Sequence, residues 1–339
     1  MKLFNIYSAS ALILLTSLGC SQDPFAVDIS QTALEIRYTN LDSIIANDSP
    51  DQVSTYLQQA YERIPNVIAY QTGYCMEIGM VNDSVFLSNL SAYKSNPYIQ
   101  RVEKRIAEKF TDLPARHQQI TDGFKRIKTH LPKAIMPAEI LYTNSKFASS
   151  AFCTKKELTI GLERYLGYKT DVIQELPPNL FYDWMKKAFE DRYLERDAVC
   201  AWILTHITPE KENSNNIDAI IQWGKILVLT EAAFPEEPKN TILRYTEKDY
   251  QWALDNERPF WDYLVKQKLL FSSNEADQMN LLHEAPFTAG LPMNEAPDRL
   301  GQFLGWRIVH SYMEQNDVTL QQLMEIPYTE ILTFYEINE

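Results

Sequence analysis

Two glycines inside one apolar helical stripe constrain the fold more than any other feature of this chain. Over residues 297–313, apolar side chains recur with a helical period at Leu300, Phe303, Leu304, Ile308 and Tyr312. Gly301 and Gly305 lie one turn apart inside this stripe, and each glycine costs roughly 1 kcal/mol relative to alanine in a helix interior. The pattern predicts a helix face, beside Trp306, that another backbone approaches very closely.

The same stretch predicts how this helix begins. Pro297 suits the first helical position, and Asp298 suits the positive N-terminal end. Residues 284–292, which precede it, read as a turn-rich loop. We interpret the helix as a tightly packed core element, and the alternative is that its glycine face lines a ligand site.

The N-terminus predicts a lipoprotein signal peptide over residues 1–19. Lys2 precedes an apolar run that is too short to span a bilayer. The run ends before Cys20 in a sequence that resembles a bacterial lipobox, although Ser17 stands where leucine is usual. We expect Cys20 to be lipidated, its acyl chains to anchor the protein, and residues 20–30 to form a tether. The alternative is an ordinary secreted protein with an accidental cysteine.

The residues after Cys20 bear on where such an anchor would lie. Ser21 follows the cysteine where aspartate could stand, and by resemblance to known sorting rules this favours the outer membrane. Residues 21–24 contain one acid and match the acidic surface-export tags only weakly. The periplasmic face is therefore preferred over the cell surface.

The net charge argues against general binding to nucleic acid or anionic lipid, and the cysteine count leaves two disulfide states open. The formal net charge is −13, and removal of Lys2 with the signal makes it −14. A chain this acidic has no general attraction to nucleic acid or anionic lipid. Cys75, Cys153 and Cys200 permit one disulfide and one free thiol, or three buried thiols.

Periodicity predicts a mostly α fold of the α+β class, with a small sheet in the middle of one large domain spanning residues 31–339. Helical patterns fill residues 31–131 and return over residues 180–339. Between them, over residues 138–163, three short β-rich runs are separated by polar turns, at 138–143, 150–153 and 157–161. We expect these runs to form an antiparallel sheet.

A small sheet placed before an inner helix resembles the layout of zinc peptidases, so we searched for their metal-binding motif. No two of the five histidines lie four residues apart, as His-Glu-x-x-His requires. His283-Glu284 is followed by Pro286, which breaks the helix that the motif needs, and by Phe287 at the second ligand position. The helix after the sheet carries Arg196-Asp197-Ala198-Val199-Cys200 instead. The sequence therefore predicts no metal, no cofactor other than the lipid on Cys20, and no catalytic residues.

Several blocks resemble the gliding-motility lipoprotein B (GldB-like) family of Bacteroidota, in the same order along nearly the whole chain. The more specific blocks are Leu158-Thr-Ile-Gly-Leu-Glu-Arg-Tyr-Leu-Gly167 and Gly305-Trp-Arg-Ile-Val-His-Ser-Tyr-Met313. The resemblance implies an outer-membrane lipoprotein of the gliding machinery that works beside the type IX secretion apparatus. It also implies a zinc-peptidase-like fold without metal ligands, and other envelope proteins of the machinery as partners.

Within these blocks we select candidate interaction or structural residues. They are Glu163, Arg164, Gly167, Arg299, Gly301, Gly305 and Trp306. The leading hypothesis is a non-catalytic scaffold or adaptor. One rival is a degenerate, metallopeptidase-like hydrolase with an unusual site near Glu163 and Glu231. Another is a glycan-binding envelope lipoprotein, which requires at least two exposed tryptophans on one groove.

Overall fold

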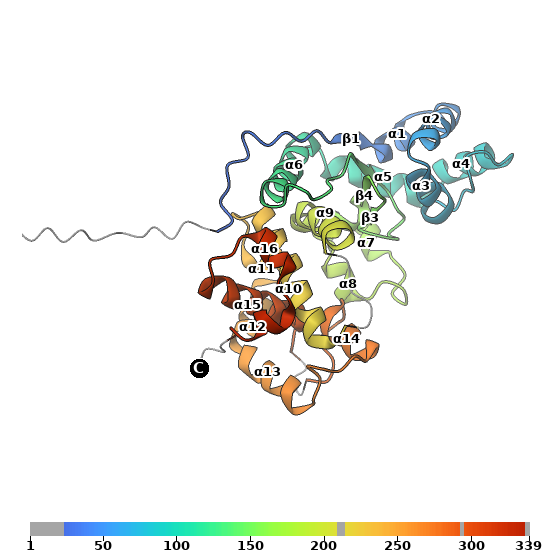
Figure 1. Cartoon of the computed structure of the whole chain (residues 1–339). Helices are drawn as coiled ribbons and strands as arrows, with labels where there is room; N and C mark the ends of the chain where they lie inside the picture. Colours follow the sequence, from blue (N-terminus) through green and yellow to red (C-terminus); the bar gives the residue numbers. More distant parts are fainter. Residues whose placement is uncertain (1–23, 209–213, 292–294, 336–339) are drawn as a thin grey trace, which may run out of the picture.

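The computed structural model describes residues 24–208, 214–291 and 295–335. It confirms a mostly α fold with one small sheet (Figure 1). The predicted signal peptide and Cys20 lie outside the described residues. In the part that is described, no helix is long and apolar enough to cross a membrane.

The sheet has four strands in the described chain, in the order β1-β2-β4-β3. Their bounds are β1 Arg37–Asn40, β2 Glu139–Thr143, β3 Ala151–Cys153 and β4 Glu157–Gly161. The first three strands in this order are parallel, and only β3 runs antiparallel to β4.

The prediction of an antiparallel sheet is therefore wrong for its central pair. The turn between β3 and β4 forms a hairpin, as the sequence indicates, but β3 takes the outer edge and leaves β4 beside β2 in parallel. The prediction also missed β1, which lies in a region expected to be helical. Its sequence, Arg-Tyr-Thr-Asn, is too short and polar to show a strand pattern.

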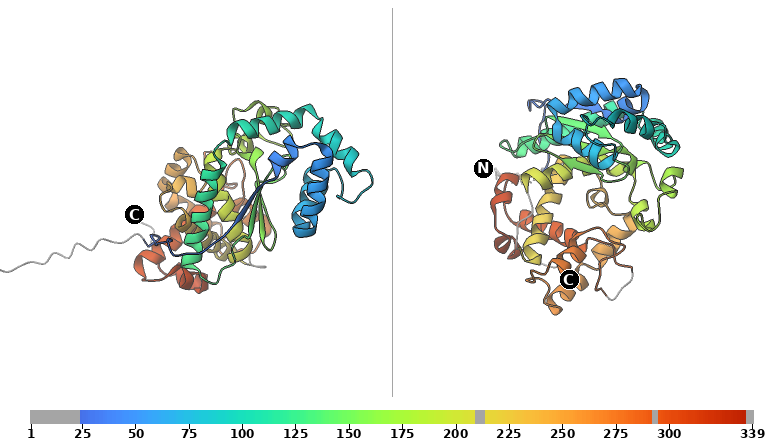
Figure 2. Two further views of the ribbon diagram at one scale, coloured as in Figure 1. Left: turned by 90° about the horizontal axis from the view of Figure 1, so that it is seen from above. Right: turned by 90° about the vertical axis from the view of Figure 1, so that its right-hand side faces the viewer.

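The sheet separates two hydrophobic cores. Every residue of β2 is buried; Ile140 and Tyr142 belong to the larger core, whereas Leu141 belongs to the smaller one. Successive side chains of a strand point to opposite faces, so β2 contributes to both cores. Figure 2 shows the sheet between the N-terminal helices on one side and the C-terminal helices on the other.

Of the helices between β1 and β2, α1 to α4 pack around the smaller core, α5 contributes to both cores, and α6 packs in the larger one. Their bounds are α1 Leu41–Asn47, α2 Pro50–Arg63, α3 Pro65–Ala69, the π-helix η1 Tyr70–Cys75, α4 Phe86–Lys94, α5 Pro97–Lys109 and α6 Leu113–His130. Prolines begin α2, α3 and α5, because proline lacks the amide hydrogen that the first turn leaves unpaired. Ser49 and Gln52 add a capping box to α2.

The remaining helices follow the sheet. They are η2 Leu162–Tyr165, α7 Asp171–Gln174, α8 Asp183–Lys187, η3 Asp191–Tyr193, α9 Leu194–Trp202, the π-helix η4 Ile203–Ile207, α10 Asn216–Ala233, α11 Lys239–Ile242, α12 Glu247–Asp255, α13 Glu257–Lys266, α14 Glu275–Leu282, α15 Leu300–Gln315, α16 Leu320–Glu325 and α17 Tyr328–Leu332. Helices α10 and α15 form the centre of this half (Figure 1).

The two glycines of α15 confirm the predicted close approach of another backbone. A Cβ atom on Gly305 would lie 1.9 Å from the carbonyl oxygen of Ile220 on α10, and one on Gly224 would lie 2.1 Å from the carbonyl oxygen of Gly305. A Cβ atom on Gly301 would lie 2.9 Å from the carbonyl oxygen of Leu281, at the end of α14. The stripe is thus a packed core face, and the alternative of a ligand site at the glycines is wrong.

The predicted start of this helix is also wrong. Helix α15 begins at Leu300, and Arg299 before it adopts a left-handed backbone with φ 53°. The carbonyl oxygen of Pro297 accepts hydrogen bonds from the amide and hydroxyl of Thr288, at 3.1 and 2.7 Å. These bonds hold Pro297 in the preceding loop, so the helix starts three residues later than the proline indicates.

The three cysteines of the described chain are free thiols. Cys75 and Cys200 are buried and Cys153 is half-buried. Burial raises the pKa of the Cys75 and Cys153 thiols to about 11. These two side chains are therefore protonated at neutral pH.

Candidate functional site

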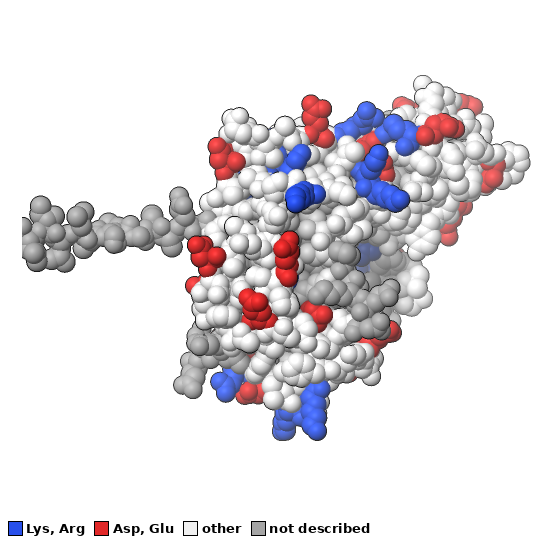
Figure 3. All heavy atoms as spheres, in the orientation of Figure 1, with Lys and Arg blue, Asp and Glu red and all other residues white. Residues whose placement is uncertain are grey.

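A charged cavity of about 290 Å³ opens between α8, the start of α12 and the loop before α15. We call it the arginine cleft. Its charged lining residues are Lys187, Arg192, Arg244, Asp249, Glu284, Glu295, Asp298 and Arg299. Elsewhere, acidic and basic side chains share the surface: in Figure 3, Lys and Arg lie toward the top and at the bottom of the face shown, and Asp and Glu are scattered over the whole of it.

Arg244 is the central residue of the arginine cleft. Its guanidinium pairs with the Glu284 carboxylate, donates to the carbonyl oxygen of Ala188 at 3.1 Å, and places Nε 3.2 Å from Oδ2 of Asp197. The side chain is only 10% exposed, and its backbone is left-handed with φ 58°. Non-glycine residues adopt this conformation rarely and at an energetic cost, which surrounding contacts must offset.

Arg299 reaches the same place from the start of α15. It donates to both carboxylate oxygens of Asp298, at 3.0 and 3.1 Å, and to the carbonyl oxygen of Arg244 at 3.1 Å. Its Nη1 lies 4.0 Å from the Glu284 carboxylate. The left-handed turn at Arg299 thus serves to aim a predicted candidate residue into the arginine cleft.

Asp197 forms the base of this cluster. It accepts hydrogen bonds from the hydroxyl of buried Tyr165 at 3.1 Å and from Arg196 Nη1 at 3.0 Å. Both Asp197 and Arg196 are about nine-tenths buried. With Arg244 on its other side, the aspartate has cations from α9 and from the segment before α12.

The charges in the arginine cleft stabilise one another. Burial acts to lower the pKa of Arg244, but the carboxylates of Asp197 and Glu284 outweigh it and hold that pKa above its ordinary value. Burial would likewise raise the pKa of Glu284, and the surrounding arginines instead hold it below its usual range. The arginines responsible are Arg244, Arg299, Arg164 and Arg196. The cluster is therefore a set of matched charges at neutral pH.

Two predicted candidates, Arg164 and Arg299, both act through their charge to lower the pKa of Glu284. Arg164 donates to the carbonyl oxygen of Phe147 at 2.8 Å and lies over the ring of Phe189. Its Nε is buried without a hydrogen-bond partner among the described residues, and burial lowers the pKa of this arginine. The sequence block that contains Arg164 and the block that contains Arg299 therefore act on the same carboxylate, although 135 positions, by the numbering, separate them.

Glu163 lies beside Arg164 in the chain but serves a different loop. It is fully buried, and its Oε1 accepts from the amides of Ser145 and Phe147, at 2.9 and 3.0 Å, and from the Ser145 hydroxyl. Its Oε2 has no hydrogen-bond partner in the described chain, and burial raises its pKa. Glu163 thus holds the turn after β2, where Lys146 and Phe147 are both left-handed.

Trp306 hydrogen-bonds to another buried carboxylate, that of Glu231 on α10. The indole Nε1 of Trp306 donates to Oε2 of Glu231 at 2.7 Å, His310 Nε2 lies 2.8 Å from the same oxygen, and Lys239 pairs with Oε1. Burial would raise the pKa of Glu231, but these partners, with His310 first, lower it. Trp306 therefore joins α15 to α10 through a charged hydrogen bond.

The rival hydrolase hypothesis placed one site near Glu163 and Glu231. The structure gives these two glutamates separate sets of partners, and no partner is shared. Gly167, the last predicted candidate, has φ 93°, which favours glycine, and its amide donates to the carbonyl oxygen of Phe189 at 2.7 Å. Gly167 thus has a role in a turn near Arg164.

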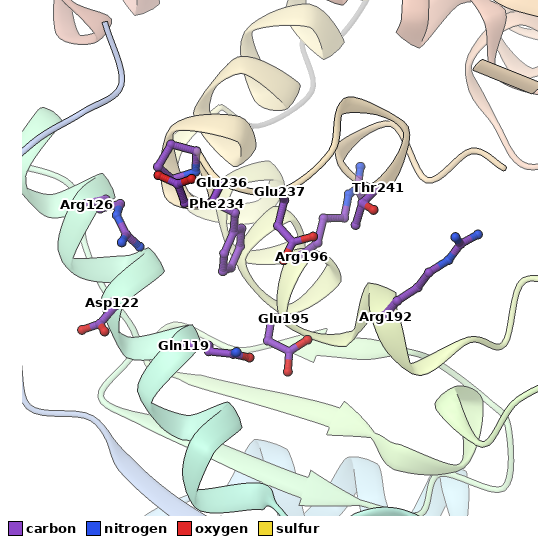
Figure 4. Close-up of a pocket in the computed structure, with 11 residues that line it drawn as sticks. Gln119, Asp122, Arg126, Arg192, Glu195, Arg196, Phe234, Glu236, Glu237 and Thr241 are labelled. Carbon is purple, nitrogen blue, oxygen red and sulfur yellow. The ribbon is translucent and has the colours of Figure 1, made fainter. Parts of the chain in front are cut away.

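A smaller cavity of about 170 Å³ lies behind the arginine cleft and shares Arg192 with it. Figure 4 shows its walls, with Gln119, Asp122 and Arg126 on α6, Glu195 and Arg196 on α9, and Phe234 pointing in from the end of α10. Arg196 forms the link between both cavities, because it lines this one and hydrogen-bonds to Asp197 beneath the other.

The helix after the sheet is where the sequence search looked for a metal motif. Arg196 and Asp197 of α9 hydrogen-bond to each other there. In residues 24–208, 214–291 and 295–335, no three His, Cys, Asp or Glu side chains form a group that could hold a metal ion.

The tryptophans bear on the glycan-binding hypothesis. Trp202 and Trp306 are buried in the larger core. Trp184 lines the arginine cleft, and Trp252 lines an apolar cavity of about 450 Å³ between α13 and residues 290–291. Each of these two cavities thus has one tryptophan in its lining, fewer than the two that the hypothesis requires.

Sequence reasoning missed the two residues that dominate the arginine cleft. Arg244 lies outside the sequence blocks from which we selected candidate residues. Asp197 entered the metal search, where it was considered only as a replacement for a zinc-site residue. Since no periodic pattern marks a left-handed arginine, only the proximity of Arg244, Glu284 and Arg299 in the fold identifies the cluster.

With this geometry described, the chain can be compared with known proteins. A family model for lipoproteins, described as "Gliding motility protein GldB", matches residues 22–335. The chain belongs to the GldB family. It is accordingly a gliding motility lipoprotein, and the family match spans both the arginine cleft and the α10–α15 contact. No curated protein and no solved structure matches the chain significantly.

Proposed function

We propose that this GldB-family chain is a non-catalytic scaffold or adaptor of the gliding machinery, linked to type IX secretion. Its lipid anchor is Cys20, in the outer membrane, with the folded part on the periplasmic side. Its partners are other envelope proteins of the gliding and secretion apparatus. The relation to zinc-peptidase folds without metal ligands stays a prediction.

One observation carries the proposal of a scaffold: the charged groups at the centre of the larger half are engaged with one another. Asp197 lies between Arg196 and Arg244, and Arg244 also pairs with Glu284. An acid–base catalyst needs a group that is free to exchange a proton with a substrate. Charges held in reciprocal pairs are better suited to fixing the relative positions of α9, α12 and the loop before α15.

A complementation experiment tests this function in cells. A deletion strain receives either wild-type protein or the Cys20→Ala variant, while single cells are tracked on glass and secreted cargo is measured in the medium. We expect the deletion to impair movement or secretion, the wild type to restore both, and Cys20→Ala to restore them poorly. The Cys75→Ala variant is the matched control, because it removes a buried thiol and leaves the anchor intact.

Normal movement and normal secretion in the deletion strain would contradict the proposal. Full rescue by Cys20→Ala would still support a role in the gliding machinery, but it would show that this role does not need the lipid anchor. Turnover of a peptide library by purified protein, abolished by Asp197→Asn, would replace the scaffold with an enzyme.

A further inference from the structure

The three parallel strands of the sheet end at one edge, and a second charged cavity lies there. Asn40 ends β1 and Asp42 follows it in α1, while Leu162 follows the last residue of β4. In open sheets, ligands bind in the crevice outside the carboxyl ends of parallel strands. A cavity of about 390 Å³ opens at this edge, between α1, α5 and Leu162. We call it the acid cavity.

Two buried carboxyl groups line the acid cavity. Asp42 of α1 is 5% exposed and Glu103 of α5 is 9% exposed. Oε1 of Glu103 is buried and has no hydrogen-bond partner in residues 24–208, 214–291 and 295–335. Throughout the described chain, no protein cation lies within ion-pair distance of either carboxyl group. Buried carboxyl groups without donors are unfavourable, so this arrangement needs a physical reason.

The cation whose charge acts on Glu103, Lys94, does not supply that reason. Lys94 of α4 attracts Glu103, but its ammonium donates to the carbonyl oxygens of Ile45 and Ala46 at the end of α1. Burial raises the pKa of Glu103 to about 7. Burial first, and then the charges of Glu103 and Glu163, raise the pKa of Asp42. The acid cavity thus has unmet capacity for a positive charge.

The walls of the acid cavity define what kind of cation fits. Ile106, Phe110, Leu113 and Leu162 give it an apolar side, and Ser43, Asn47 and Gln100 add polar groups. Lys104 also lines the cavity, but its side chain is largely exposed and its ammonium lies 3.8 Å from the Glu108 carboxylate rather than beside either acid. Its volume is within the range of small-molecule sites, roughly 300–1,000 Å³, whereas one water takes about 30 Å³. A bare Ca²⁺ ion would need about six to eight oxygen ligands. An organic cation with an apolar stem uses both the two acids and the apolar wall.

We propose that the acid cavity binds a primary amine: its ammonium pairs with Asp42 and Glu103, and its alkyl or aryl stem packs on Ile106 and Phe110. The amine comes either from a free small molecule or from a lysine side chain of a peptide. This site is separate from the arginine cleft and does not depend on the proposed role in gliding.

The test uses the full-length lipoprotein in detergent, with calorimetric titration and thermal unfolding at pH 8. The probes are hexylamine, phenethylamine and N-acetyl-lysine methylamide, and the neutral controls are hexanol and phenethyl alcohol. We expect saturable binding of one amine per chain, at least tenfold tighter than that of the matching alcohol. Binding of a free amine alone identifies a small molecule, and binding of the lysine derivative alone identifies a peptide.

Variants connect this binding to the two acids. Asp42→Asn and Glu103→Gln should each weaken amine binding at least tenfold while the ligand-free variant unfolds at the same or a higher temperature than the wild type. Glu108→Gln is the matched control on the same helix, because Glu108 is exposed and pairs with Lys104 and Arg105. It should bind amines as the wild type does.

Three results would overturn the proposal. They are amines that bind no tighter than alcohols, amine binding that survives in the Asp42→Asn/Glu103→Gln double variant, and stabilisation of the wild type by Ca²⁺ but by none of the amines. If either variant fails to fold, the comparison of amines with alcohols on the wild type still decides.

Discussion

In the arginine cleft, the buried guanidinium of Arg244 lies between Asp197 and Glu284, whereas in the acid cavity Asp42 and Glu103 face no cation within ion-pair distance in the described chain. Both regions bury charge beside the same small sheet. In the first, the buried guanidinium and the carboxylates balance one another's charge, and this pairing contributes to the fold. In the second, two buried carboxyl groups lack a counter-charge, which is energetically unfavourable. Such unfavourable groups commonly occur at binding sites.

The largest expected effect tests the core beside the arginine cleft. Gly305→Ala should lower the free energy of unfolding by about 4 kcal/mol or more, because its Cβ would overlap the carbonyl oxygen of Ile220 at 1.9 Å. Urea unfolding measures the change. Gly73→Ala is the control, since the nearest atom to its Cβ is a flexible methionine sulfur at 3.8 Å. Equal, small losses in both variants would show that α10 and α15 can move apart.

The next effect concerns the arginine cleft itself. Arg244→Met should cost about 3–5 kcal/mol in unfolding free energy, because removal of one partner leaves buried Asp197 with less compensation. Arg258→Met removes an exposed arginine that pairs with Asp262, and it should cost less than about 1 kcal/mol. If the Arg244→Met protein were as stable as the wild type, the arginine cleft would have no role in stabilising the fold.

The acid cavity predicts a pH dependence of stability. Because the folded state raises the pKa of Glu103 from 4.5 to about 7, the unfolded chain releases this proton first as pH rises. Stability should therefore fall between about pH 4.5 and 7, by up to about 3 kcal/mol from this group. Glu103→Gln should lack this fall, and Glu108→Gln should retain it, in urea unfolding at pH 4.5, 6 and 8. If the free energy of unfolding depended on pH in the same way in the wild type and in Glu103→Gln, Glu103 would not be a buried acid without a partner.

The smallest effect concerns Glu231, a buried carboxylate with its donors in place. Trp306→Phe should cost about 2 kcal/mol, because it removes the indole that donates to Glu231 at 2.7 Å while His310 and Lys239 stay. Trp261→Phe, whose ring packs on Tyr335 at the surface of the core, should cost less. Thermal unfolding of the two variants side by side measures this difference, and a larger loss for Trp261→Phe would contradict it.

The sequence predicts much of the fold because local signals determine much of it. The runs at 138–143, 150–153 and 157–161 became β2, β3 and β4 within two residues. Gly305 indicated the close contact of α15 with α10, and Gly301 indicated its close contact with the end of α14. Strand direction was not predictable, since it depends on which edge β3 occupies. The start of α15 was mispredicted because Thr288, in the preceding loop, hydrogen-bonds to Pro297, and no helix-start signal reports such a loop contact.

The candidate sites were predictable only in part. Arg164 and Arg299 were selected from their sequence blocks, but their shared electrostatic effect on Glu284 arises from the tertiary fold. No sequence pattern marked Asp42 and Glu103 as buried acids of one cavity, because each occupies an ordinary helical position and their burial follows from the packing of α1 on α5. A buried acid without a partner has no sequence pattern of its own.

The contrast between the two regions is tested most directly by one pair of variants in the same assay. Asp197→Asn and Asp42→Asn each replace a buried carboxyl group by an amide of the same shape, and urea unfolding at pH 8 gives both free energies. We expect Asp197→Asn to lose stability, because Arg196 and Arg244 lose their counter-charge, and Asp42→Asn to keep or gain it. Loss of stability in both variants to a similar extent would contradict the distinction between a structural charge cluster and a prepared binding site.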